Sequence, residues 1–328
     1  MKTLQLLAVW GLEVVAVSAA YCVKTLAPIG GGPRQEQSVV AAGDKIYIVA
    51  GLRKGAGLRG ENITSAVEVY DTVKDTWSDV APLPFAVHHS NVAAVDGKLY
   101  YLGGLYSATG SIFPSVVRAD SYRYDPTTNK WEPLAPMPNA RGSAAMGVHG
   151  KTIYLVGGLL ADMQAVDTVS SYDTVTNTWK SLDALKLPEA RDHAGSVVVN
   201  NTFYLVGGRV GGPWQNRGTV LTLDLKNPST WMPKASMPVA RGGLAVAEAA
   251  GRIWAFGGEG NKASAKGVFG DVNVYDIKKD TWETAAPMTA PRHGFGAASV
   301  GGRVYVPGGG ANQGGGGMVD VNEAYYAC

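Results

Sequence analysis

The residues best suited to chemistry gather at one recurring place in this 328-residue chain, the segment that leads into the first strand of each repeat. Four of the five histidines stand in these lead-in segments. The segments read Arg34-Gln35-Glu36, Val87-His88-His89, Arg141-Gly142-Ser143, Arg191-Asp192-His193, Arg241-Gly242-Gly243 and Arg292-His293-Gly294. Histidine exchanges protons near neutral pH, and a neighbouring carboxylate can orient its ring. We therefore predict a catalytic group made of His193, Asp192 and Arg191.

A repeat of about fifty residues must position these segments. Glycine pairs, with Ala50-Gly51 in the first copy, follow one another at separations of 53, 54, 50, 50 and 51 residues. Tryptophans keep nearly the same step, at Trp77, Trp131, Trp179, Trp231 and Trp282. A period of this length indicates an architecture in which similar units stack on their neighbours.

Residues 141–182 show that one repeat holds four short strands. Residues 141–148 suit a crowded inner strand, 152–156 a second, 169–173 a third, and Asn177 opens a fourth after a tight turn. One such blade cannot bury both faces, so we expect blades to stack around an axis with each tryptophan packed between blades. The lead-in segments and the loops after the glycine pairs then share one rim of a central channel.

The glycine pair, the Tyr-Asp before a turn, the Asn-x-x-Trp or Asp-Thr-Trp and the Pro-Met-Pro-x-x-Arg together resemble Kelch repeats. The resemblance implies an all-β fold, a six-bladed Kelch β-propeller with four-stranded antiparallel blades. The sixth repeat lacks a fourth strand, and residues 22–28 align with 76–82, so we expect the N-terminal strand to close the last blade. Cys22 and Cys328 then flank one hairpin turn, which favours a disulfide over two free thiols.

The same rim is the predicted binding surface. Its loops carry apolar groups in polar or glycine-rich stretches, namely Tyr106, Phe113, Met163, Trp214 and Phe269. With Arg and His below them, they predict a small apolar organic ligand that has an enolic or anionic oxygen. The predicted binding residues are Arg34, His88, His89, Tyr106, Arg141, Trp214, Arg241, Arg292 and His293. A structural role stays open for each arginine, because the Kelch pattern itself carries Arg at this position.

Charge and targeting signals narrow the class of protein. Lys plus Arg exceeds Asp plus Glu by 29 − 27 = +2, so no basic field for nucleic acid exists. Residues 1–20 resemble a signal peptide, and their apolar run is too short to span a membrane. We therefore expect one domain at residues 21–328, in a secreted protein or the lumen of the secretory pathway. Asn62 and Asn200 begin sequons that could then carry glycans. The oligomeric state stays open.

Copper-radical oxidases also carry Kelch-type repeats, but they need a tyrosine cross-linked to a cysteine. Here both cysteines are expected to pair with each other. His88 and His89, adjacent in a strand, should also point to opposite faces. We therefore predict neither a metal nor a cofactor.

Signal peptide, repeat number and chain size resemble the hetero-Diels–Alderases of fungal tropolone–terpenoid pathways. The resemblance implies dehydration of a hydroxymethyl tropolone-like precursor to a quinone methide, followed by addition of an olefin. His193 would protonate the departing hydroxyl, arginines would hold the oxygens, and Tyr106 and Trp214 would cover the olefin. The alternative is a non-enzymatic binding module, whose Arg141, Arg292, Tyr106 and Trp214 grip a glycan or a protein partner.

Overall fold

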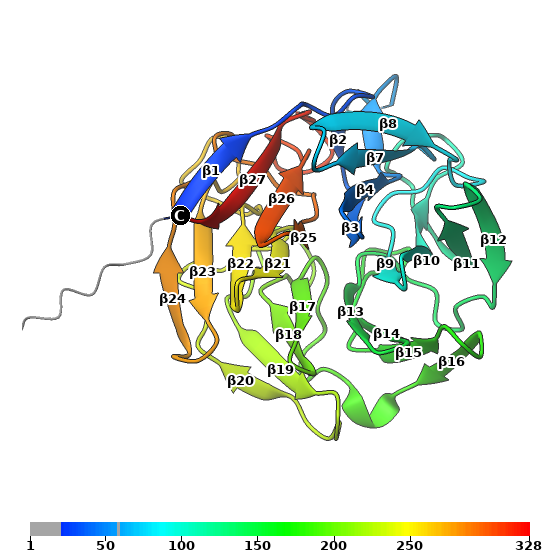
Figure 1. Cartoon of the computed structure of the whole chain (residues 1–328). Coiled ribbons are helices and arrows are strands. Elements are labelled where there is room, and N and C mark those ends of the chain that lie inside the picture. Colours follow the sequence, from blue (N-terminus) through cyan, green and yellow to red (C-terminus); the bar gives the residue numbers. More distant parts are fainter. Residues whose placement is uncertain (1–20, 58–59) are drawn as a thin grey trace, which may run out of the picture.

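The computed structural model describes residues 21–57 and 60–328, and Figure 1 shows their strands arranged as sectors around a central channel. Within these residues the strands form six four-stranded sheets, the blades, and one three-stranded sheet. The predicted signal peptide lies outside the described residues. In the described ranges, no helix has the length and apolar character needed to cross a bilayer.

The first three blades run from the inner to the outer strand in chain order. Blade 1 contains β3 (Ser38–Ala42), β4 (Lys45–Val49), β7 (Val67–Asp71) and β8 (Thr76–Val80). Blade 2 contains β9 (Val92–Val95), β10 (Lys98–Tyr106), β11 (Val116–Asp125) and β12 (Lys130–Leu134). Blade 3 contains β13 (Ala145–His149), β14 (Thr152–Val156), β15 (Val169–Asp173) and β16 (Thr178–Ser181). The middle strands of blade 3 match the boundaries predicted from the sequence.

Blades 4 and 5 repeat this order, whereas the outer strand of blade 6 is β1 from the N-terminal end. Blade 4 contains β17 (Gly195–Val199), β18 (Thr202–Val206), β19 (Val220–Asp224) and β20 (Met232–Lys234). Blade 5 contains β21 (Ala245–Ala249), β22 (Arg252–Phe256), β23 (Val272–Asp276) and β24 (Thr281–Thr284). Blade 6 contains β25 (Ala298–Val300), β26 (Arg303–Pro307), β27 (Asn322–Ala327) and β1 (Tyr21–Thr25). The small sheet pairs β2 (Arg34–Gln35), β5 (Leu52–Lys54) and β6 (Glu61–Ile63), and a short 3-10 helix, η1, covers Asp183–Leu185.

The inner strands make a closed ring around the channel. Each contacts the next in the order β3, β9, β13, β17, β21, β25, and β25 contacts β3 again. Small residues such as Ala93, Gly147 and Ala247 line the channel, because large side chains would not fit where the strands converge. The six-bladed propeller predicted from the repeat is confirmed.

Each repeat tryptophan ties its blade to the one before it. The indole N–H of Trp77 donates to the carbonyl of Ala27 at 3.0 Å, and that of Trp131 donates to Ala81 at 2.9 Å. Trp179, Trp231 and Trp282 make the same contact with Ala135, Leu185 and Ala235. The indole thus fills the gap between blades while its one polar group is satisfied, as a structural tryptophan requires.

The two ends of the chain meet in blade 6. Strand β1 pairs antiparallel with β27, with Cys22 in register with Tyr326, and both lie side by side in Figure 1. Cys22 and Cys328 form a disulfide with a Cα–Cα distance of 5.8 Å across 306 residues of sequence. The predicted seam and its disulfide are confirmed. The strand removes a free sheet edge, and the crosslink contributes at most about 5 kcal/mol by restricting the unfolded chain.

Candidate functional site

A cavity of about 590 Å³, the rim cavity, lies where the lead-in segments meet the loops after the glycine pairs. Its apolar side, the lip, consists of Ile112, Phe113, Leu159, Met163 and Pro213. Its polar side, the floor, consists of Glu36, His89, Asp192, His193, Arg209, Glu259 and His293. Apolar walls around a few convergent polar groups are typical of a small-molecule site.

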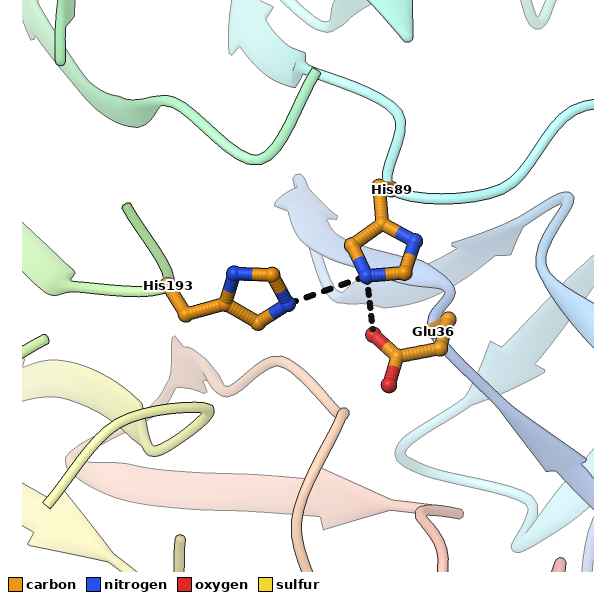
Figure 2. Close-up of side chains that lie close together, drawn as sticks. All are labelled: Glu36, His89 and His193. Atoms are coloured by element: carbon orange, nitrogen blue, oxygen red, sulfur yellow. Dashed lines mark hydrogen bonds and ion pairs between the residues drawn. The ribbon is translucent and has the colours of Figure 1, made fainter. Parts of the chain in front are cut away.

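A ring of residues in the left-handed backbone conformation carries the centre of the floor. Glu36, His89 and His193 have φ values of 52°, 49° and 50°, a conformation that costs a side-chain-bearing residue about 1–2 kcal/mol. Backbone hydrogen bonds offset this cost: His89 N–H donates to Glu36 O at 3.1 Å, and Glu36 N–H donates to Gly294 O at 2.6 Å. The three side chains consequently point toward one another, as Figure 2 shows.

These three residues also separate two spaces. Glu36, His89 and His193 line the rim cavity and a smaller cavity of about 130 Å³ on their other side. The smaller cavity shares Ala144, Leu244 and other residues with the central channel. The floor is therefore a partition between the rim cavity and the channel, and its groups are shielded from bulk water.

Hydrogen bonds fix the tautomer of His193. Its Nδ1 donates to Asp192 Oδ1 at 2.5 Å, and both side chains are almost fully buried. Arg209 Nη2 lies 3.0 Å from His193 Nε2, and because a guanidinium can only donate, that nitrogen must accept. His193 is thus held as a neutral ring whose lone pair lies at Nε2.

The network continues through two more histidines. His89 Nε2 lies 2.9 Å from His193 Nε2 and 3.2 Å from Glu36 Oε2, so its one N–H faces both acceptors (Figure 2). Its Nδ1 accepts from His88 Nδ1 at 2.6 Å. Burial lowers the pKa of His88 to about 3, with repulsion from His193 adding to the effect. Burial and the neighbouring histidines also hold the pKa of His89 well below its ordinary value. Both rings are therefore uncharged at neutral pH.

Two carboxylates of the floor, Asp192 and Glu259, stay ionised. Burial opposes the charge of Asp192, but the hydrogen bond from His193 and the charge of Arg209 hold its pKa below the usual value. Burial likewise opposes the charge of Glu259, whereas His293 and Arg209 lower its pKa. Arg209 makes an ion pair with both carboxylates. His293 donates from Nε2 to loop carbonyls, and its Nδ1 lies 3.6 Å from Glu259 Oε2.

Glu36, His89 and His193 present their ligand atoms within 4.8 Å of one another, a set of two histidines and one carboxylate that suits a transition metal. However, Arg209 Nη2 stands 3.0 Å from the same His193 nitrogen that a metal would need. A cation would have to displace this fixed positive charge. The donor set therefore fits a hydrogen-bonded network better than a metal centre, and the absence of a metal stays a prediction.

One argument of the sequence analysis is wrong. His88 and His89 were expected to point to opposite faces, but their rings touch, with Nδ1 atoms 2.6 Å apart. The alternation of a strand fails here because His89 has a φ of 49°. Three observations still argue against a copper-radical centre. Arg209 stands beside His193 Nε2, and Cys22 is paired with Cys328. No tyrosine of the described residues lines the rim cavity.

The structure brings only some of the predicted residues together. His89, Asp192, His193 and His293 lie in the floor, and Phe113 and Met163 lie in the lip. His88 stands behind His89 and does not line the cavity. Tyr106 packs in blade 2 beneath the guanidinium of Arg118, and Trp214 is 56% exposed on the rim near Lys262.

The five lead-in arginines turn away from the rim cavity, which corrects their predicted placement. Arg141 donates to the carbonyls of Gly157 and Leu155, and the other four are buried in the same position of their blades. These are Arg34, Arg191, Arg241 and Arg292. A regular strand would place the arginine and the residue two positions later on the same side. The later residue has a positive φ in every case, for example 51° at Ser143 and 50° at His193, so the alternation is broken and this residue points to the axis while the arginine points into the blade. Each of the five guanidinium groups donates to at least one backbone carbonyl.

The predicted glycan sites lie away from the rim cavity's lining. Asn62 is exposed on β6, and Asn200 occupies the turn between β17 and β18. Glycosylation at both positions stays a prediction.

Sequence reasoning missed three floor residues: Glu36, Arg209 and Glu259. Arg209 and Glu259 each come directly after a glycine pair, where the other repeats have Leu52, Leu105, Leu159 and Gly310. The sequence does carry a signal for these two residues: opposite charges occupy a position that is leucine or glycine in the other repeats. They pair with each other across the cavity.

Comparisons with known proteins agree with this architecture. Residues 88–309 match the KLHDC2/KLHL20/DRC7 Kelch-repeats domain, and residues 33–84 match the Kelch motif. Kelch-like protein terF of Aspergillus terreus is 37% identical over 286 residues, 85% of this chain and 61% of that protein. Kelch-like protein 34 of Homo sapiens is 28% identical over 73% of this chain and 37% of its own length. The chain therefore spans less than two thirds of these relatives.

A solved structure supports the fold. The structure of YjhT superposes with a TM-score of 0.73, covering 90% of this chain and 95% of that one, at 20% sequence identity. This likeness concerns the fold alone. Together, the closed ring of blades, the matched repeats and the fungal relative establish that the chain belongs to the Kelch-repeat proteins.

Proposed function

We propose that this protein is a secreted, metal-free and cofactor-independent enzyme that acts on a small organic molecule in the rim cavity. The observation that carries the proposal is the buried Asp192–His193 pair in the floor of a cavity whose lip is apolar. The finer proposal is a dehydration followed by a hetero-Diels–Alder cycloaddition, in natural-product biosynthesis. It rests on the resemblance in chain organisation described above and on the chemistry of the floor.

The floor can move the two protons that dehydration requires. His193 Nε2 accepts the proton of a ring hydroxyl, while the adjacent hydroxymethyl group leaves with a proton donated by protonated His293 Nδ1. The C–O bond breaks, an exocyclic C=C bond forms, and the products are water and a neutral quinone methide. Exchange with solvent then returns one proton to His293 and removes one from His193. Each such proton transfer typically contributes about 10²–10⁴-fold in rate.

His193 is neutral in the resting state, which favours the role of proton acceptor over the donor role predicted from the sequence. To accept a proton, His193 Nε2 has to exchange the hydrogen bonds that it receives from Arg209 and His89 for one from the ligand hydroxyl, and the Asp192 carboxylate at Nδ1 would stabilise the imidazolium that forms. A proton on His293 Nδ1 would instead face Glu259 at 3.6 Å and Glu36 at 4.0 Å. The two histidines therefore divide the work of acid and base.

The apolar lip would bind the olefin in the second step, the cycloaddition. An olefin joins the quinone methide by forming one bond to the exocyclic carbon and one to the ring oxygen. Ile112, Phe113 and Met163 offer apolar contacts that would hold such an olefin beside the quinone methide. Keeping two reactants together in the reactive geometry can lower a barrier by about 7–11 kcal/mol. Hydrogen bonds from the floor to the ring oxygen would stabilise the charge that develops there.

Secretion is part of the proposal. The Cys22–Cys328 disulfide supports an oxidising compartment, because such bonds rarely persist in a reducing cytosol. We propose no nucleic acid partner and no membrane association.

A direct reconstitution tests the proposal. A hydroxymethyl tropolone and a macrocyclic terpene olefin are incubated with wild-type protein, with His193→Gln, with the remote control His149→Ala, and without protein. We expect faster and stereoselective product formation with wild type and His149→Ala alone. Equal rates and the same stereochemical mixture in all four tubes would contradict the proposal.

One observation favours a second candidate, a binding module for a glycan. Trp214 is 56% exposed on the rim, where an aromatic face can stack on a sugar ring. A glycan array probed with wild type and with Trp214→Ala would show hits that depend on this side chain. An array without such hits would remove this candidate.

A further inference from the structure

We infer that the rim cavity selects a neutral ligand that presents hydroxyl donors to the floor, and that it rejects anionic ligands. This inference rests on the proposed function and specifies its substrate class. It also replaces the anionic oxygen expected from the sequence, an expectation that depended on arginines now located inside the blades. Two independent features carry it: the charge of the floor and one unpartnered carboxylate oxygen.

The floor is negatively charged. Glu36, Asp192 and Glu259 face a single guanidinium, that of Arg209, so the formal balance is +1 − 3 = −2 when the histidines are neutral. If one histidine is protonated, as the proposed reaction needs, the formal charge of the floor is still −1. An anionic ligand would therefore enter a site that already carries excess negative charge and is shielded from water, where repulsion is strong.

Asp192 supplies a specific acceptor. Its Oδ1 accepts from His193 at 2.5 Å and from Arg209 Nε at 2.8 Å. Its Oδ2 has no hydrogen-bond partner among residues 21–57 and 60–328, although the side chain is fully buried and lines the rim cavity. A buried carboxylate oxygen without a donor is costly, so a donor from the ligand would be bound strongly.

A hydroxyl suits this oxygen better than an ammonium group does. Although the floor is negatively charged, an ammonium group would have to give up its hydration in a buried site with an apolar lip, and this costs more than desolvating a hydroxyl. The lip above the floor is apolar, so the body of the ligand has to be apolar as well. An apolar molecule that carries neighbouring hydroxyl groups meets both requirements.

Four probes with one carbon skeleton separate the possibilities. The proposed class is represented by ortho-hydroxybenzyl alcohol, the anion by ortho-hydroxybenzoate, the cation by ortho-hydroxybenzylamine, and the donor-free control by ortho-methoxybenzyl methyl ether. Binding to the full-length protein is measured by calorimetry and ligand-observed NMR at neutral pH. We expect the alcohol to bind roughly tenfold more tightly than the ether and the benzoate, the value of one hydrogen bond to a charged acceptor.

The variant Asp192→Asn makes the test specific. The amide keeps one oxygen for His193 and Arg209 but places an N–H₂ donor where Oδ2 was, so the alcohol should lose its advantage while the ether binds unchanged. His149→Ala serves as the remote control and should retain the wild-type preference. Tightest binding by the benzoate or the amine, equal binding of all four probes, or no binding of any would overturn the inference. Because turnover is not measured, the preference can hold even where the cycloaddition fails.

Discussion

Asp192 Oδ1 accepts a hydrogen bond of 2.5 Å from His193 Nδ1 inside the partition between the rim cavity and the channel. The two residues are neighbours in the chain, yet their side chains meet. They do so because His193 has a φ of 50°, which breaks the alternation of the strand. The pair sets the tautomer of His193 and therefore its ability to accept a proton at Nε2.

The first prediction concerns this pair. Asp192→Asn removes the negative charge that orients the His193 ring, so we expect turnover of the hydroxymethyl precursor to fall about 10²-fold or more. The substitution also removes a buried charge beside Arg209, so turnover is compared at a temperature at which thermal unfolding shows both variants to be folded. Asp162→Asn, on an exposed part of the rim, is the matched control and should keep full turnover. Equal turnover by both variants would show that the pair has no catalytic role.

The second prediction concerns the lead-in arginines. Arg292 donates to the carbonyls of Gly308, Ala290 and Val306 and to Glu323, and the side chains of both charged residues are fully buried. Arg292→Met would leave the Glu323 charge uncompensated, so we expect a loss of about 3–5 kcal/mol in the free energy of unfolding. Urea unfolding measures this loss, with exposed Arg303→Met as control. An unchanged unfolding midpoint together with weaker substrate binding would restore the binding role that the sequence suggested.

The third prediction concerns pH. The folded-state pKa of His88 is about 3, compared with 6.5 for the free side chain, so below pH 6.5 the unfolded chain binds a proton that the folded chain does not. The stability that neutral His88 provides is therefore complete above pH 6.5 and is lost as pH falls toward 3. We expect a slope of about 1.4 kcal/mol per pH unit from this residue.

Urea unfolding of wild type and His88→Leu between pH 7 and 4 checks the slope. The variant lacks the titrating ring, so its stability should depend less steeply on pH, and the difference between the two proteins should shrink as pH falls. Parallel curves would contradict the assignment of a neutral, buried His88.

The fourth prediction concerns metals. Because Arg209 occupies the position beside His193 Nε2, we expect purified protein to contain no stoichiometric copper, zinc, iron or cobalt, and cobalt(II) to give no tetrahedral absorption bands on addition. Arg209→Leu removes the obstacle and should bind cobalt more tightly than wild type. A full equivalent of metal in the wild-type protein would overturn the proposal of metal-free chemistry.

The fold could be predicted because its determinants are local and repeated. The glycine pairs, the tryptophans and the alignment of residues 22–28 with 76–82 are visible in the sequence, and each corresponds to a contact in the structure. The disulfide followed from the same alignment, since Cys22 and Cys328 take the places on either side of a hairpin turn.

The position of the site could be predicted from the sequence, but not all of the residues that line it. The sequence indicated the correct rim, yet it did not show that the lead-in arginines point into the blades whereas residues two positions later reach the axis. Gly243 and Gly294 occupy the same position in their repeats as His193 and His89, and they have φ values of 63° and 64°. Glycine at this position was therefore a sign of left-handed backbone. Arg209 and Glu259 were missed because their pairing depends on how the neighbouring blades 4 and 5 pack against each other.

The most direct test of the central claim is a crystal structure of the protein bound to ortho-hydroxybenzyl alcohol. We predict that the ring of the ligand lies against Phe113 and Met163, with a hydroxyl within hydrogen-bonding distance of Asp192 Oδ2. A ligand bound in the central channel, or on Trp214 at the outer rim, with the floor of the rim cavity unoccupied by it, would contradict the account.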